Sequence, residues 1–264
     1  MMIDRIRTII DKEWSEVFKN RMVLFTIVLI PLLFTILPLA SLYFTKTTNP
    51  SGGDMADMPA QFASTCGVMA LQDCMQIFIV NEFLLLYMIM PLMIPITIAA
   101  YSIVGEKATH SLEPLLATPI TTFELLTGKN LAATIPAVIA TWGCFGIFLL
   151  LLPITGASRV VQNHILGPTW LLAILVMGPL MSILAVNFAV IISSRVNDPR
   201  VAEQISAILI VPILGALFGQ IAGVILINLQ LIIISILVLG MVDVGVIYLG
   251  AGLFQRENIL TRWK

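Results

Sequence analysis

The stretch LIIISILVLGMVDVGVIYLGAGLF, Leu231 to Phe254, is 24 residues long and contains one ionisable side chain, Asp243. About 20 apolar residues in helical conformation cross the roughly 30 Å hydrocarbon core of a bilayer. This stretch can therefore span a membrane as a single helix. Five further runs of the same kind precede it, at residues 22–44, 83–104, 131–152, 171–193 and 205–227. The six runs take up about half of the chain and leave no stretch long enough for a soluble catalytic domain.

The overall composition indicates the same class. Of the 264 residues, 59% are hydrophobic and 11% are charged, and the mean hydropathy is +1.02. A soluble domain usually carries about 25% charged residues, and a net charge of −1 offers no electric field that would attract nucleic acid. We therefore expect an all-α, multi-pass membrane protein that binds lipid and no nucleic acid, with a helix at 1–21 and a six-helix domain at 22–264.

The distribution of Lys and Arg predicts the orientation, because basic residues near span ends stay in the cytoplasm. If both termini are cytoplasmic, only Lys46 and Arg159 of the 14 basic residues lie outside. We expect this topology, in the plasma membrane of a prokaryote.

The first 21 residues are typical of an amphipathic "elbow" helix on the inner membrane surface. One helical face, with residues three or four apart, carries apolar side chains, while most charged residues fall on the other face: the apolar residues are Ile3, Ile6, Ile10, Trp14, Val17 and Phe18. Such a helix can act as a passive anchor or as a lever attached to the first span.

Two expectations concern the outer segments. Apolar residues at helical spacing between Val68 and Ile79 predict an interfacial helix leading into the second span, and the short link 228–230 predicts a tight hairpin between the fifth and sixth spans. Cys66 and Cys74 can form a disulfide only if this helix is broken, for example at Gly67, because eight residues of continuous helix separate Cα atoms by about 12 Å. The alternative is two unpaired thiols, and we expect the nearby methionines to serve packing rather than a metal site.

The longest inner segment, GEKATHSLEPLLATPITTFELLTGKN at 105–130, contains two helix starts. Ser111 can cap a short helix carrying Leu112, Leu115 and Leu116, and Pro119 ends it. Thr121 and Glu124 then have the spacing of a capping box at the start of the third span.

This loop, together with the elbow helix and six spans, resembles the permease subunits of ABC exporters of the ABC-2 type. The resemblance implies that 111–117 is a coupling helix that docks on a separate ATPase subunit, which binds ATP and Mg²⁺, and that a second permease chain, identical or related, completes the transporter. It places Glu106 and Lys107 at the base of the second span, near the elbow. The coupling residues it implies are Glu106, Lys107, His110, Ser111, Leu112, Leu115, Leu116, Thr118 and Pro119, and the pathway residues are Phe34, Met90, Met93 and Phe218.

Several catalytic functions are excluded by the motifs. A P-loop needs Gly-Lys followed by Ser or Thr, but Gly128-Lys129 is followed by Asn130, so we expect no ATP hydrolysis and no cofactor in this chain. In the expected topology His110 and His164 lie on opposite sides of the membrane, which rules out a metal or catalytic pair of histidines within one chain.

Asp243 is the one ionisable residue expected inside a span. It would either contact a substrate or cation, or form a hydrogen bond with Asn187 or Gln220 that stabilises helix packing, and we favour the second interpretation. A largely apolar pathway suits a lipophilic or amphipathic cargo. Two other functions remain as alternatives: a stand-alone secondary carrier or channel, and a membrane scaffold or assembly factor.

Overall fold

The computed structural model describes residues 2–19, 21–47, 58–67, 69–108 and 121–253, and these are almost entirely helical, with no strand among them. Six helical segments within these residues are long and apolar enough to cross a membrane. They are Val23–Lys46, Leu71–Glu106, Phe123–Thr155, Arg159–Arg195, Pro199–Ile221 and Leu229–Gly250. Each contains or overlaps one of the six predicted runs, which confirms the all-helical fold with six candidate spans.

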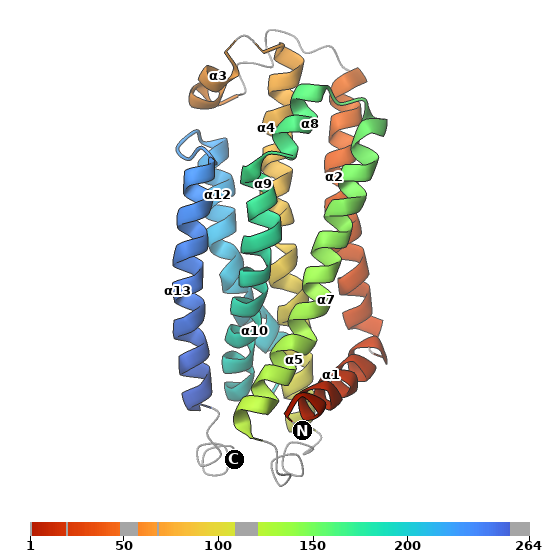
Figure 1. The fold of residues 1–264 in the computed structure, drawn as a ribbon, viewed down its shortest axis with the longest axis vertical. Helices are drawn as coiled ribbons and strands as arrows, with labels where there is room; N and C mark the ends of the chain where they lie inside the picture. Colours follow the sequence, from red (N-terminus) through yellow and green to blue (C-terminus); the bar gives the residue numbers. More distant parts are fainter. Residues whose placement is uncertain (1, 20, 48–57, 68, 109–120, 254–264) are drawn as a thin grey trace.

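The six spans form an elongated bundle, and the first helix lies across one end of it (Figure 1). The first span is α2 (Arg21–Thr47), the third is α7 (Thr122–Leu151) followed by η1 (Leu152–Thr155), and the sixth is α13 (Leu229–Leu253). The helix at the end of the bundle is α1 (Met2–Lys19), which packs mainly on α7 and also contacts α2 and α5.

The second span forms the centre of the core. It consists of α4 (Leu71–Tyr87) and α5 (Met90–Ala108), which are separated at Met88 and Ile89, just before Pro91. The α5 helix packs against α10, α7 and α11, and Ile94, Ile96 and Ile98 on it are almost completely buried. A displacement of α5 would therefore displace the helices packed against it, since close-packed interiors transmit strain.

The fourth and fifth spans are also interrupted next to prolines. The fourth runs through α8 (Arg159–Ile165), α9 (Pro168–Leu172), a π-helical turn η2 (Ala173–Met177) and α10 (Gly178–Arg195). The fifth consists of α11 (Pro199–Ser206), a 3₁₀ turn η3 (Ala207–Ile210) and α12 (Val211–Ile221). The two irregular turns end just before Pro179 and Pro212, where the ring removes a backbone donor and disrupts regular helical bonding.

The opposite end of the bundle differs from the prediction in where its elements begin and end. The predicted helix up to Ile79 is present from Leu71, and α4 runs on without interruption to Tyr87, so it is continuous with the second span. The link between the last two spans is longer than 228–230, because α12 ends at Ile221 and Gly223 follows in the left-handed conformation, with φ +71°. The α13 helix packs chiefly on α10, so it does not form a tight hairpin with α12.

Candidate functional site

The α1 helix packs on the bundle through a face that contains a charged residue. Its buried residues are Ile9, Glu13 and Val17, four residues apart, whereas Ile3 and Phe18 are exposed. The indole N–H of Trp14 donates a hydrogen bond to the Ala132 carbonyl of α7 at 3.0 Å. The predicted apolar stripe is thus divided, with one part against the helices and the rest free to contact lipid.

A glycine allows α1 to approach α7 closely. A Cβ atom placed on Gly128 would lie 2.8 Å from Cγ2 of Ile9, which is too close for a normal contact. The adjacent residue, Lys129, therefore has its side chain next to α1 at a point where the two helices are in direct contact.

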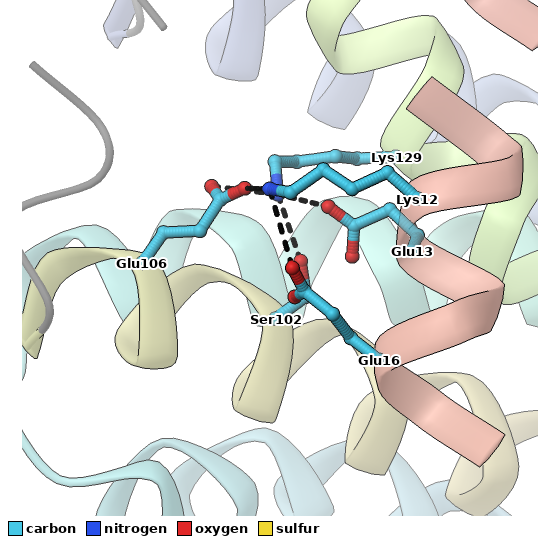
Figure 2. Close-up of polar contacts among 6 residues, drawn as sticks. All are labelled: Lys12, Glu13, Glu16, Ser102, Glu106 and Lys129. Atoms are coloured by element: carbon cyan, nitrogen blue, oxygen red, sulfur yellow. Dashed lines mark hydrogen bonds and ion pairs between the residues drawn. The ribbon is translucent and has the colours of Figure 1, made fainter. Parts of the chain in front are cut away.

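Four charged residues from α1, α5 and α7 form a cluster at this junction, which we call the charge cluster: Lys12, Glu13, Glu106 and Lys129 (Figure 2). The Lys129 ammonium lies 2.7 Å from Glu13 Oε1 and 2.8 Å from Glu106 Oε2, and it donates a hydrogen bond to the Ser102 hydroxyl at 2.8 Å. Glu13, Glu106 and Lys129 are all less than 10% exposed. An ammonium group has three N–H donors, and here three oxygens from two helices surround it.

The second cation of the cluster, Lys12, is half-exposed and pairs with Glu106 and, at 3.7 Å, with Glu16. Burial disfavours the charge on Lys12, but the hydrogen bond and the negative charge of Glu106 outweigh this effect and raise the pKa of Lys12 above its usual value. Lys12 is therefore protonated at neutral pH, and the two buried carboxylates face two cations. The balance matters because an unpaired buried charge costs several kcal/mol, roughly 3–5 when one partner of a pair is removed.

A second contact joins α1 to the start of α7. The Thr121 hydroxyl accepts from the Glu124 N–H, and the Glu124 carboxylate accepts from the Thr121 N–H at 2.8 Å, so the predicted capping box is present. The same carboxylate lies 3.4 Å from the Arg5 guanidinium. The α1 helix thus contacts a residue just before segment 109–120, Glu106, and a residue just after it, Glu124.

The structure places the predicted coupling residues as follows. Glu106 lies in the charge cluster, and Lys107 belongs to α5. The rest of the set, His110, Ser111, Leu112, Leu115, Leu116, Thr118 and Pro119, lies outside the described residues.

The predicted pathway residues do not share one surface. Met90 is fully buried, Phe34 and Met93 are partly buried against the same core, and Phe218 is 64% exposed on α12. Asp243 is buried, and its carboxylate makes no hydrogen bond within the part of the chain that the structure describes.

The expected partners of Asp243 have other neighbours. The Asn187 oxygen accepts from the Asn130 amide at 3.1 Å, and Gln220 lies beside Glu82 on α4. The sequence had indicated that Asp243 is the one acid inside a span, and this prediction is wrong. Glu82 lies within the second span, and Glu203 of α11, in the fifth span, accepts a hydrogen bond from the Thr97 hydroxyl of α5.

Cys66 and Cys74 are joined by a disulfide, with Cα atoms 5.7 Å apart. The α3 helix (Ala60–Cys66) ends at the first cysteine, and Gly67 follows with a positive φ of 54°, so the helix is broken between the two cysteines. No group of three or more His, Cys, Asp and Glu side chains that could hold a metal ion occurs among the described residues.

Comparison with protein families gives a match that extends over nearly the whole chain. The family model described as "ABC-2 family transporter protein" matches residues 7–255, a range that includes most of α1 and all six spans. No curated protein matches the chain.

Proposed function

The chain belongs to the ABC-2 family of transporter proteins, and we propose that it is the permease of an ATP-driven exporter whose ATP and Mg²⁺ are bound by a separate ATPase subunit. Membership of this family makes the chain an integral, multi-pass membrane transport subunit rather than an enzyme. The partner ATPase, the outward direction and the cargo are the proposed part.

The observation that carries this proposal is the attachment of α1 at both ends of segment 109–120. In the family this segment's counterpart docks on the ATPase, and here α1 is bonded to Glu106 before it and to Glu124 after it. A force applied to the segment would reach α5 and α7 together, because the charge cluster and the Arg5–Glu124 pair join both helices to α1. Since α5 contacts α10, α7 and α11, the movement would spread through the bundle.

The same proposal includes an orientation. The α1 end would face the cytoplasm, with both chain termini, and the end that bears α3 and the disulfide would face outside. This fits the excess of basic residues at the α1 end and the oxidising compartments in which disulfides persist. We further propose a prokaryotic plasma membrane, a second permease chain as partner, and a lipophilic or amphipathic cargo.

The test is to purify the tagged chain from its native membrane in mild detergent, identify the proteins that accompany it, and assay vanadate-sensitive ATPase activity. The expected result is a P-loop ATPase in near-equal amount. Leu115→Asp should abolish its recovery, because a charge would disrupt an apolar docking face, whereas Leu166→Asp at the opposite end should not. Normal ATPase recovery with Leu115→Asp would refute the assignment of 111–117 as the docking segment.

A stand-alone secondary carrier is the second candidate, and one observation favours it. Asp243 is an acid within a span whose carboxylate makes no hydrogen bond among the described residues, Glu82 is a second acid within a span, and ion-coupled carriers use such groups. A carrier predicts transport in proteoliposomes without nucleotide, with the chain purified free of any ATPase. The exporter predicts no transport under those conditions.

A further inference from the structure

A cavity of about 650 Å³ lies at the end of the bundle opposite α1. Its walls come from α3, α4, α8, α12 and the link after α12, which gather at the top of Figure 1. Pockets that bind small organic ligands usually measure about 300–1,000 Å³. The cavity is therefore large enough for a small organic molecule.

Two contacts constrain α3 and the preceding residue, Pro59, on one side of the cavity. The disulfide joins the end of α3 to α4, and both cysteines line the cavity. Pro59, at the start of α3, contacts the link after α12, where a Cβ atom on Gly223 would lie 2.8 Å from Cβ of Pro59. These two contacts preform the site, so a ligand would not have to order it.

The polar groups in its wall have defined roles. The indole N–H of Trp170 donates to Asn81 Oδ1 at 3.0 Å, which fixes that oxygen as an acceptor because an indole N–H can only donate. His164 Nε2 lies 2.8 Å from the same oxygen, so it is the donor of that bond. In the neutral imidazole the other nitrogen, Nδ1, is then left with a lone pair that can accept a hydrogen bond.

The polar side chain with the most unsatisfied capacity is Gln220. It lines the cavity and is 1% exposed, yet neither amide atom makes a hydrogen bond of standard geometry among the described residues. Its neighbour Glu82 has both carboxylate oxygens buried, and the Gln220 side chain is the polar group that interacts with them. Burying a polar group without a partner is unfavourable, so a ligand that donated a hydrogen bond to the Gln220 oxygen would gain binding energy there.

The same residues indicate the sign of the charge that a ligand in this cavity would carry. No Lys or Arg is among the described residues that line the cavity, while the carboxyl group of Glu82, which is not itself a wall residue, interacts with the Gln220 side chain. The remaining wall is mostly apolar, with Phe62, Ile77 and Leu226 among its residues. The surroundings thus favour a positively charged head and an apolar body.

We propose that this cavity binds an amphipathic organic cation, whose protonated amine donates to Gln220 and His164 near Glu82 and whose apolar body lies against α3, α4 and the link after α12. Binding itself is independent of any ATPase.

The test uses three ligands that share one indole body and differ in the head group: tryptamine, tryptophol and indole-3-propionate. Each is titrated by calorimetry into the 264-residue chain in phosphatidylcholine nanodiscs, with empty nanodiscs subtracted. Tryptamine should bind at least tenfold more tightly than the other two. Equal affinity for the three, or no tryptamine signal above that of empty nanodiscs, would overturn the proposal.

Three variants test whether tryptamine binds in this cavity. Glu82→Gln should weaken tryptamine binding at least tenfold and change tryptophol binding less than twofold, and an unchanged tryptamine affinity would contradict the role of the carboxylate. Should this variant not fold, Val160→Trp provides the second test, because its half-exposed position on the rim lets the indole fill the cavity and abolish binding. Ile154→Trp, on an exposed position outside the cavity wall, is the matched control and should bind like the wild type. If Val160→Trp also binds like the wild type, the site lies elsewhere and the proposal fails, whatever the result of the ATPase purification.

Discussion

Replacing Lys129 with methionine should destabilise the protein more than any other single substitution in the charge cluster. Methionine keeps the length of the side chain but removes the ammonium that lies 2.7 Å from Glu13 and 2.8 Å from Glu106. Two buried carboxylates would then share one half-exposed cation, Lys12. Breaking a buried pair by removing one partner costs about 3–5 kcal/mol. For a chain of this size each kcal/mol lowers the melting temperature by about 2–4 °C, so a decrease of about 10 °C is expected.

Thermal unfolding in nanodiscs, followed by tryptophan fluorescence and circular dichroism, measures this loss. Arg5→Met is the matched control, since it removes a cation from the same helix pair at a site that is 32% exposed and 3.4 Å from its partner. The Glu124 carboxylate is itself only 6% exposed, but it keeps its hydrogen bonds from Thr121, so the loss of Arg5 should cost less than the loss of Lys129. The double variant Glu13→Gln, Lys129→Met should recover part of the loss, because it removes one of the two unpaired acids. If Lys129→Met lowers the melting temperature no more than Arg5→Met, the cluster does not join α1 to the bundle and the reasoning is refuted.

Three other substitutions have defined expected outcomes. Gly128→Ala should destabilise the protein by about 1–3 kcal/mol, because the new methyl group would overlap Ile9, and a melting temperature equal to that of the wild type would show that α1 does not pack this closely. Replacing Cys66 and Cys74 together by serine should cost about 2.5 kcal/mol, the chain-entropy value for cysteines eight positions apart, measured against the oxidised wild type by the same unfolding assay. Asp243→Asn should leave the melting temperature unchanged or raise it, since the carboxylate has no hydrogen bond to lose among the described residues. A clear decrease for Asp243→Asn would mean that the charge itself stabilises the fold.

The spans and the start of α7 could be predicted because their signals are local. A run of about 20 apolar residues indicates a membrane helix whatever the rest of the chain does, and Thr121 with Glu124 forms a capping box through bonds three residues apart. The charge cluster could not be predicted in this way. Glu13 and Lys129 are 116 positions apart and Lys12 and Glu106 are 94 apart, so only the packing of α1 across α5 and α7 brings them together. One signal was available, because Glu13 lies midway between Ile9 and Val17 on a buried face.

The errors at the other end of the bundle have one physical cause. The second span was expected to begin at Phe83 because Glu82 interrupts the apolar run, but the helix continues through this acid and begins at Leu71. A search for apolar runs stops at an acid such as Glu82 that is flanked by further polar residues, whereas a helix ends only where its backbone bonds cannot continue. Gly223, with its left-handed conformation, is such a point, and Glu82 is not.

The charge cluster helps to choose between the two interpretations of α1, a passive anchor or a lever. An anchor needs an apolar face toward lipid and basic residues toward headgroups, and it gains nothing from turning an acid inward. In this structure α1 turns Glu13 inward to meet Lys129, and its Lys12 and Arg5 pair with Glu106 and Glu124, on either side of segment 109–120. Buried ion pairs add little net stability compared with apolar packing, but they depend on one position and orientation of the helices that carry them. That dependence favours the lever, because a helix that transmits a displacement has to keep its register against α5 and α7, and an anchor does not.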